Sequence, residues 1–441
     1  MSWLNCRIRE TDHDGGITEN RAVMGNRCET FDKEIGDLLR LEEQRQLSQL
    51  SLVASENYSS PRVREFEGSL FADKNAEGYP GSRCVSGCEH ADKLERLAIE
   101  RAKSVFGCEH ANVQAMSATI ANFAVMNGLF QPQDRLMAMR LQDGGHLSHG
   151  ASFHASGQNF RWCFYGVSKS DEQLNYDEVR SIALENRPLA IICGGSSYPR
   201  LIEYEKMHEI AREIDALLWV DLAHTAGLVA GRAVPSPFPH ADIVTTSTHK
   251  TLRGPRGGGL ILCKSSLGKA IDRAIFPGLQ GAPKMDLIAA RAALFAEVQT
   301  SCFQRYAREV LKNAKALENG LLEAGATLVS GGTSSHLLLL SLMSSDMSGR
   351  QLEVALSGAQ VIANRNPIPF DRRPPSEAGG LRIGSAALTT RGFDEAQFVQ
   401  LGKLIGDVVT STDKHRGIAS LSAFVRDNTE GLPLFNEKWL T

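Results

Sequence analysis

Continuous apolar runs, separated by helical patterns, mark the middle of the chain. A strand covered on both faces of a parallel sheet has no polar side, so such runs predict buried strands. The runs lie at residues 136–139, 189–193, 217–221, 243–244 and 260–262. Because helical patterns alternate with them, the sequence predicts a mostly parallel α/β sheet.

Amphipathic and turn-rich segments accompany these runs. Apolar residues recur at helical spacing through residues 31–50 and predict an amphipathic arm of the kind that often packs on a partner copy. Helices are predicted at residues 92–106 and 120–129, with a strand beginning at 112–114. The segment 276–283 is rich in glycine and proline and predicts a loop.

The pattern changes near Arg305. A helix through Leu322, a strand at 337–340 and a helix at 350–356 predict a small α+β domain. We therefore predict an N-terminal extension and helical arm at residues 1–48, a large domain at 49–305 and a small C-terminal domain at 306–441.

Composition narrows the class of protein. The 441 residues are 42% hydrophobic and 22% charged, which is ordinary for a globular protein. A net charge of −3 gives no electrostatic case for a nucleic-acid or membrane partner. The first thirty residues mix arginines with acidic residues and lack an apolar core, so neither a transit nor a signal peptide is expected. Together with nine scattered cysteines, this predicts a cytoplasmic protein.

One group of cysteines and histidines could suggest zinc. Its members are Cys84, Cys88, His90, Cys108 and His110. Their spacings match no paired Cys-x-x-Cys knuckle. The predicted helix at 92–106 would also separate the two halves by about 22 Å. We therefore expect no metal site.

The segment 245–259 carries the most specific chemistry. Lys250 lies there among small hydroxyl residues and close to two arginines, a setting that disfavours its protonation. Considered by itself, the segment is explained equally well by a solvated lysine in a glycine-rich loop. Asp221, at the end of the run 217–221, decides between them. A lysine that holds an aldehyde and a carboxylate that keeps a pyridine nitrogen protonated are the two groups that pyridoxal phosphate (PLP) requires.

Other segments are ambiguous alone. Small hydroxyl residues at 117–119 precede a helix and could cradle a phosphate or act as ordinary N-caps. His146 follows glycines and could lie flat on an aromatic ring. Arg382, between glycines, suits either a carboxylate grip or the surface. The loop carrying Glu77 is either surface or site lining. Ligands of α/β sheets bind at the carboxyl ends of strands, where Ser196, Asp221 and Lys250 fall.

In this order the segments resemble the serine hydroxymethyltransferase family over residues 31–393, most of the chain. The motifs that carry the resemblance are Ala54-Ser55-Glu56-Asn57-Tyr58, Ala76-Glu77-Gly78-Tyr79-Pro80-Gly81, Gly144-Gly145-His146-Leu147, Asp221-Leu222-Ala223-His224 and Thr248-His249-Lys250-Thr251-Leu252-Arg253-Gly254-Pro255-Arg256. The family implies a PLP-dependent enzyme of fold type I, with a mostly parallel large domain and a smaller α+β C-terminal domain. It also implies a homodimer or tetramer.

The resemblance implies a cofactor role for several residues. Lys250 would bind PLP covalently, and Asp221 would pair with its pyridine nitrogen. His146 would stack on the ring, and His224 would lie beneath it near the ring oxygen. Phosphate contacts would come from Ser117, Ala118, Thr119, Ser196 and His249, with Gln280 and Gly281 arriving from a second subunit.

The resemblance also implies substrate contacts. Ser55 and Arg382 would grip the carboxylate of the amino acid. Glu77 would act as the acid/base group near the substrate hydroxyl and the folate. Further substrate contacts would come from Arg256, Leu141, Leu147 and Asn366.

The chain departs from the family where the family has tyrosines. Asn75 stands before the Ala-Glu-Gly-Tyr-Pro-Gly motif, and Cys84 and Val85 replace a Tyr-Tyr pair after it. The phosphate loop Ser-Gly-Ser-Gln becomes Ser-Ala-Thr-Ile at 117–120, and Ala282 ends the Gln-Gly-Gly loop. The family histidine before Gly-Gly-His is an aspartate here, Asp143.

Three functions follow from this comparison. The first is interconversion of serine and glycine with one-carbon transfer to tetrahydrofolate. The second is a folate-independent threonine transaldolase or β-hydroxy amino acid aldolase, favoured by the missing tyrosines. The third is a catalytically weak homologue kept as a binding subunit, which the intact Lys250 and Asp221 argue against.

Overall fold

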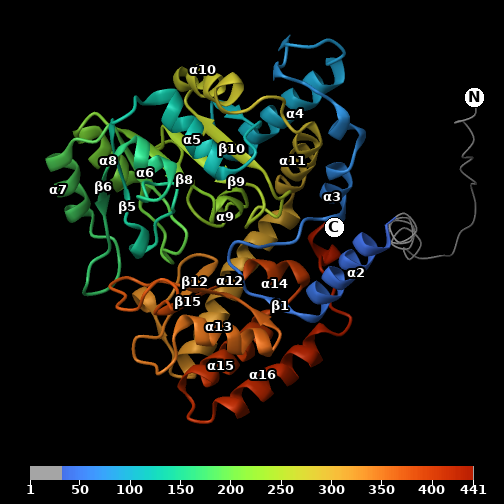
Figure 1. The fold of residues 1–441 in the computed structure, drawn as a ribbon, viewed down its shortest axis with the longest axis vertical. Helices are drawn as coiled ribbons and strands as arrows, with labels where there is room; N and C mark the ends of the chain where they lie inside the picture. Colours follow the sequence, from blue (N-terminus) through green and yellow to red (C-terminus); the bar gives the residue numbers. More distant parts are fainter. Residues whose placement is uncertain (1–31, 441) are drawn as a thin grey trace, which may run out of the picture.

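The computed structural model describes residues 32–440, and a seven-stranded sheet forms the centre of its larger body (Figure 1). The strand order is β4-β10-β9-β8-β7-β5-β6. β10 is antiparallel to both neighbours, and the pairs from β9 to β6 are parallel, which confirms the predicted mostly parallel sheet. The strands are β4 His110–Asn112, β5 Arg135–Met139, β6 Arg161–Tyr165, β7 Ala190–Cys193, β8 Leu217–Asp221, β9 Ile243–Ser247 and β10 Gly259–Cys263.

Helices cover both faces of this sheet. Leu218 and Val220 of β8 belong to one apolar core and Trp219 to another, since successive side chains of a strand point to opposite faces. Both faces of the sheet are therefore buried, which explains the continuous apolar runs in the sequence. The helices of this body are α3 Pro61–Glu67, α4 Glu89–Phe106, α5 Ala118–Leu129, α6 Ala155–Asn159, α7 Tyr176–Asn186, α8 Tyr204–Glu213, α9 Ala226–Ala230, α10 Ser265–Arg273 and α11 Met285–Val298.

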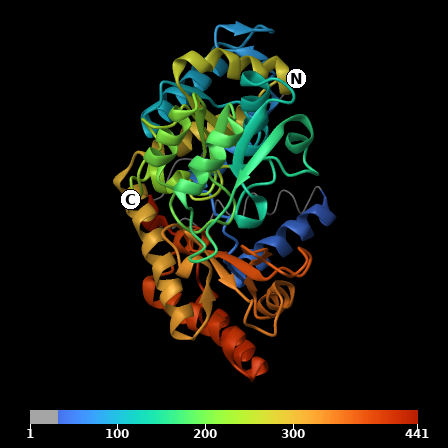
Figure 2. The same cartoon turned by 90° about the vertical axis from the view of Figure 1, so that its left-hand side faces the viewer.

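A four-stranded antiparallel sheet forms the smaller body, which lies below the larger one in Figures 1 and 2. Its strand order is β11-β12-β15-β14, and helices pack against it through their apolar residues, as the predicted α+β domain requires. The elements are α12 Ser301–Glu323, β11 Thr327–Leu328, β12 Leu337–Ser341, α13 Gly349–Gly358, β13 Val361–Ile362, β14 Asn364–Asn366, β15 Gly380–Gly384, α14 Ala386–Arg391, α15 Glu395–Thr410 and α16 Lys414–Thr429.

The predicted domain boundaries stay predictions. α12 continues through residues 305 and 306 without a break. β1 (Leu50–Ser51) pairs in parallel with β13, and this pairing places Leu50 and Leu52 in the core of the smaller body. The chain therefore begins against the smaller body before it enters the larger one.

Two local predictions were wrong. The strand expected to begin at 112–114 is β4, which ends at Asn112. Oδ1 of Asn112 accepts a hydrogen bond from the Gln114 amide at 2.9 Å, and this side-chain turn takes the chain out of the ladder. The segment 276–283 is not all loop, because residues 274–279 form a wide helical turn that is interrupted at Phe276.

The predicted arm is α2 (Lys33–Ser48). The Arg391 guanidinium, itself buried, fixes the end of this helix by donating to the backbone carbonyls of Gln46, Leu47 and Gln49. The apolar residues of the arm are more than half exposed; they are Ile35, Leu38, Leu39 and Leu41. Phe31, which the prediction included, lies outside the described residues.

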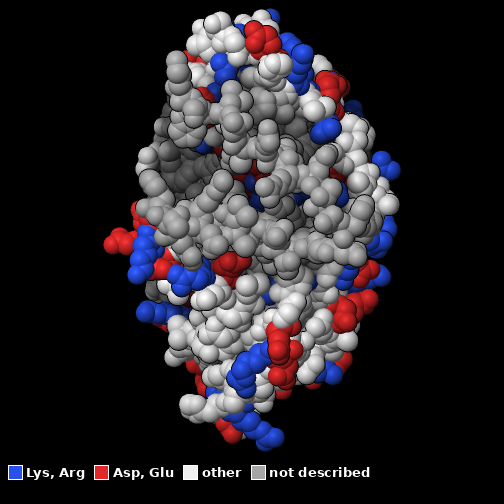
Figure 3. Space-filling model, turned by 90° about the vertical axis from the view of Figure 1, so that its right-hand side faces the viewer, with Lys and Arg blue, Asp and Glu red and all other residues white. Residues whose placement is uncertain are grey.

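The visible part of one face of the molecule carries charges of both signs (Figure 3). Where described residues are visible in Figure 3, acidic and basic side chains are interspersed. Within residues 32–440, no helix combines the length and the apolar character needed to span a bilayer, and no cluster of three metal-ligating side chains occurs. The predictions for the extension at 1–31 lie outside the described residues.

Candidate active site

The strand order brings Lys250 and Asp221 to one edge of the large sheet. β8 and β9 are neighbours, with Asp221 opposite Thr245, and Lys250 follows the end of β9. The Asn57 amide donates to the carbonyl of Lys250 at 2.8 Å and also to the Tyr306 hydroxyl at 2.8 Å. The backbone that carries Lys250 is thus tied to a distant segment of the chain.

The amine of Lys250 loses its proton more readily than an ordinary lysine amine. Burial lowers its pKa to about 8, and the positive charges of Arg382 and Arg256 act in the same direction against the opposing charge of Asp221. At pH 7 about one amine in ten is then unprotonated, against about one in three thousand for an ordinary lysine. A neutral amine is the form that attacks an aldehyde.

Asp221 is a buried carboxylate with three hydrogen-bond donors. Its Oδ2 accepts from Asn122 Nδ2 at 3.0 Å and lies 3.1 Å from His149 Nε2, while its Oδ1 accepts from the Ala223 amide at 2.9 Å. Burial alone would raise the pKa of Asp221, but its interactions with His149, with His146 and with Asn122 hold that pKa well below its usual range. The group is therefore an anion at neutral pH, suited to a protonated ring nitrogen.

Helix α5 begins beside the Lys250 loop. Ser117 caps the helix, since its Oγ accepts from the Ile120 amide at 3.1 Å. Gly259 lies so close that a Cβ there would meet the Ser117 carbonyl oxygen at 2.3 Å. Ala118 and Thr119 form the first turn, whose free amides and dipole suit a phosphate.

Two histidines of the predicted site have depressed pKa values. Burial lowers the pKa of His146 to about 4 and that of His249 to about 3. Nδ1 of His146 lies 2.7 Å from the Ser148 hydroxyl. Nδ1 of His249 is buried and, among the described residues, has no hydrogen-bond partner. Both rings are neutral at pH 7, so they can contact a cofactor without adding charge.

Arg382 reaches this edge from β15 of the smaller body. Its Nη1 donates to the Ser196 carbonyl at 2.7 Å, and its Nε and Nη2 both lie 3.3 Å from Oδ1 of Asn364. Asn364 of β14 is therefore the residue that contacts Arg382. The side-chain amide of Asn366, which was predicted to contact the substrate, donates to the Pro367 carbonyl. Ser55 is half-buried in the segment whose Ala54 packs against Gly384, at the end of β15.

Glu77 and Gly281 form a second group. A Cβ on Gly281 would lie 3.4 Å from Oε1 of Glu77. The side-chain amide of Gln280 is used within its own chain, since its Oε1 accepts from the Met116 amide and its Nε2 donates to the Gln114 carbonyl. Because both polar atoms of this side chain are already bonded, Gln280 would contact a second subunit through its backbone.

Other predicted residues lie at the surface. Arg256 is exposed, and Leu141 and Leu147 are more than a third exposed. Asn75 and Cys84 are exposed and Val85 is 38% exposed, at the hairpin of β2 (Gly78–Tyr79) and β3 (Ser82–Arg83). Within residues 32–440, no hydrogen bond joins this hairpin to Lys250.

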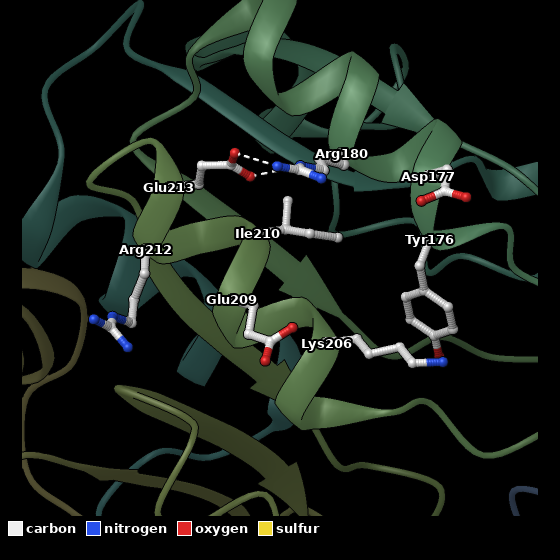
Figure 4. Close-up of a pocket in the computed structure, with 8 residues that line it drawn as sticks. All are labelled: Tyr176, Asp177, Arg180, Lys206, Glu209, Ile210, Arg212 and Glu213. Atoms are coloured by element: carbon white, nitrogen blue, oxygen red, sulfur yellow. Dashed lines mark hydrogen bonds and ion pairs between the residues drawn. The ribbon is translucent and has the colours of Figure 1, made fainter.

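The wider of two cavities lies away from this site. A surface groove of about 560 Å³ lies between α7 and α8, where Arg180 pairs with Glu213 and the Lys206 ammonium lies 5.0 Å from the centre of the Tyr176 ring (Figure 4). The small pocket that Asp221 and His224 line has a volume of only about 40 Å³. The groove between α7 and α8 has the larger volume, but neither Lys250 nor Asp221 lines it.

Residues that the sequence analysis left unassigned complete the site. His149 and Asn122 hold Asp221, Asn57 holds the Lys250 loop, and Asn364 contacts Arg382. His146 and His149 lie in one turn, in which the His149 amide donates to the His146 carbonyl at 2.9 Å. Their ring centres are 5.5 Å apart.

The fold and the site define a class of protein. PLP needs a lysine for its aldehyde and a carboxylate for its ring nitrogen. Lys250 and Asp221 supply both at the carboxyl edge of a mostly parallel sheet, where α/β proteins bind ligands. The residues fit the cofactor, and the chain is a PLP-dependent enzyme of fold type I.

Comparisons with known proteins then give the family. The family model described as serine hydroxymethyltransferase matches residues 28–405. A serine hydroxymethyltransferase of a Nostoc species is 47% identical over 382 residues, which cover 87% of this chain and 90% of the relative. One from Phenylobacterium zucineum is 49% identical over 378 residues, covering 86% and 88%. The chain belongs to the serine hydroxymethyltransferase family.

Proposed function

We propose that this protein interconverts serine and glycine and exchanges the one-carbon unit with tetrahydrofolate, using PLP. The observation that carries the proposal is the pairing of a lysine of lowered pKa, Lys250, with the anionic Asp221, in a chain 47–49% identical to serine hydroxymethyltransferases. When bound, PLP supplies an electron-withdrawing ring that stabilises negative charge on the α-carbon of the amino acid.

Different residues of the chain would have separate roles toward the cofactor. Asp221 would keep a proton on the ring nitrogen of the cofactor, because its pKa is far below neutral. Lys250 would hold the aldehyde and, when released, accept or return a proton at the α-carbon. The start of α5, with Ser117 and Thr119, would hold the phosphate together with His249.

Arg382 would orient the amino acid through its carboxylate. Its guanidinium is largely buried, and burial lowers its pKa only to about 10, so it stays charged at neutral pH. Two parallel N–H donors match the two oxygens of a carboxylate. Ser55, from the segment packed against Gly384, would add a hydroxyl donor.

Replacing Arg382 with alanine should raise KM for serine by roughly 10²-fold, since two charge-assisted hydrogen bonds are lost. PLP should still bind, because Arg382 is not among the groups assigned to the cofactor. Steady-state kinetics and visible absorbance measure the two effects separately. The exposed Arg372→Ala is the matched control and should leave KM unchanged. An unchanged KM in the Arg382 variant would remove it from the substrate site.

The proposed reaction is tested by comparing two substrates. Purified protein is supplied with PLP, and turnover is measured for serine with tetrahydrofolate and for threonine without it. The proposal predicts serine turnover that depends on the folate. Turnover of threonine alone, with serine inert in the presence of folate, would contradict it and favour a folate-independent aldolase.

We also propose that the protein works as at least a dimer. Leu38 and Leu39 of α2 are 66% and 55% exposed, an apolar face that another copy would cover. Glu77 and Gly281 lie together and would complete the site of a second copy. Most homo-oligomers of this kind have two-fold symmetry.

Sedimentation should therefore give a species of at least two chains. Leu38→Asp should weaken the association, because a carboxylate would be buried in an apolar contact. Val354→Asp is the matched control, since Val354 on α13 is 65% exposed and belongs to no proposed contact. A PLP-loaded monomer with full activity would contradict the proposal.

A further inference from the structure

Two buried histidines meet behind the candidate site. His224 follows β8, and His336 immediately precedes β12 of the smaller body. Their rings stack at an interplanar angle of 24° with centres 5.4 Å apart. Nδ1 of His224 lies 3.4 Å from Nε2 of His336. The two bodies of the molecule are therefore in direct contact through a pair of imidazoles.

The surroundings of His336 fix its proton. Nε2 of His336 lies 3.2 Å from the carbonyl oxygen of Ala54, which can only accept a hydrogen bond. Nε2 must therefore carry a hydrogen. A neutral imidazole has one such hydrogen, so Nδ1 of His336 is bare. That atom is buried and has no hydrogen-bond partner among residues 32–440, so no neighbouring acceptor requires a hydrogen there.

Both imidazoles are neutral. Burial lowers the pKa of His336 to about 3 against the opposing hydrogen bond to Ala54, with further lowering from the charges of Lys250 and Arg382. Burial also takes the pKa of His224 well below its usual value, and the same two charges add to the effect. Each ring therefore has one N–H and one bare nitrogen at neutral pH.

The proton of His224 follows from that of His336. A hydrogen on Nδ1 of His224 would point at the hydrogen on Nε2 of His336, and the two would repel. A bare Nδ1 instead accepts part of the hydrogen bond that His336 gives to Ala54. The hydrogen of His224 is then on Nε2, which makes no hydrogen bond within the described part of the chain.

We propose that His336 is a positioning residue that holds His224 in the Nε2–H tautomer. His224 thereby offers a hydrogen-bond donor to a ligand bound beside Asp221, with which it lines a small pocket. His336 also links His224 to the segment that contains Ser55, because Nε2 of His336 lies 3.2 Å from the carbonyl oxygen of Ala54, the residue before Ser55. Only the identity of the ligand, PLP, rests on the proposed function.

The tautomer can be measured directly by nitrogen NMR on the full chain with ¹⁵N-labelled histidine, with and without PLP. His224→Gln identifies the signal of His224 by its loss. We expect Nε2–H in the wild type and in His336→Gln, whose amide can still donate to both partners. His336→Phe, which keeps a ring but has no donor, should release a mixture of tautomers.

Two results would overturn the proposal. One is the Nδ1–H tautomer in the wild type, which decides the matter even where His336→Phe does not fold. The other is an unchanged tautomer in a folded His336→Phe. A parallel titration should show PLP affinity roughly tenfold weaker in His336→Phe and nearly unchanged in His336→Gln. Failure of the wild type to bind PLP would refute the proposed function but leave the tautomer result standing.

Discussion

Lys250→Ala should lower turnover by roughly 10⁴-fold, because the substitution removes both the group that holds the cofactor and a proton acceptor at the reacting carbon. PLP should still bind through its phosphate and ring contacts, so the variant retains cofactor in a form that dialysis removes. The measurement pairs turnover with the visible spectrum of the protein, which reports covalent attachment.

Lys269→Ala is the control for this prediction, since Lys269 is an exposed lysine on α10, outside the site. It should retain turnover and the spectrum of the wild type. Turnover of Lys250→Ala within about tenfold of the wild type would mean that another amine does the work, and the assignment of Lys250 would be lost.

Asp221→Asn should lower turnover by roughly 10³-fold. The amide keeps the shape of the side chain but has no charge to hold a proton on a ring nitrogen. It also places an NH₂ group among the donors Asn122 and His149, which now face a carboxylate. We expect PLP to bind and the covalent link to Lys250 to form, with the loss confined to catalysis.

The surface variant Asp177→Asn on α7 should behave like the wild type, since Asp177 is exposed at the first turn of that helix. A second comparison separates charge from packing. Asp221→Glu keeps the charge but lengthens the side chain, and should lose less activity than Asp221→Asn. Equal losses in the two variants would show that packing, rather than charge, is what Asp221 contributes.

The sheet could be predicted because burial leaves a simple pattern. The run 217–221 is apolar on both faces, and the structure makes it β8 with the predicted bounds. The end of β4 at Asn112 was harder to predict, because the Asn112 side chain accepts a hydrogen bond from the Gln114 amide and ends the strand early. The wide turn at 274–279 was missed because glycine and proline are also typical of loops.

The site could be predicted only in part, because its supporting contacts join residues far apart in the chain. Asn57 reaches the carbonyl of Lys250 across 193 positions, and Asn122 reaches Asp221 across 99. Neither contact has a local spacing that a single sequence reveals. Lys250 and Asp221 were found because each stands at the end of its own apolar strand, where topology alone brings side chains together.

The most direct test of this account is reduction of the PLP-loaded protein with borohydride, followed by peptide mapping. Reduction makes the bond between PLP and a lysine amine permanent, so the labelled peptide reports which lysine holds the cofactor. One label is expected, on Lys250 in the segment 245–259. A label on any other lysine, or a PLP-saturated protein that takes no label, would contradict it.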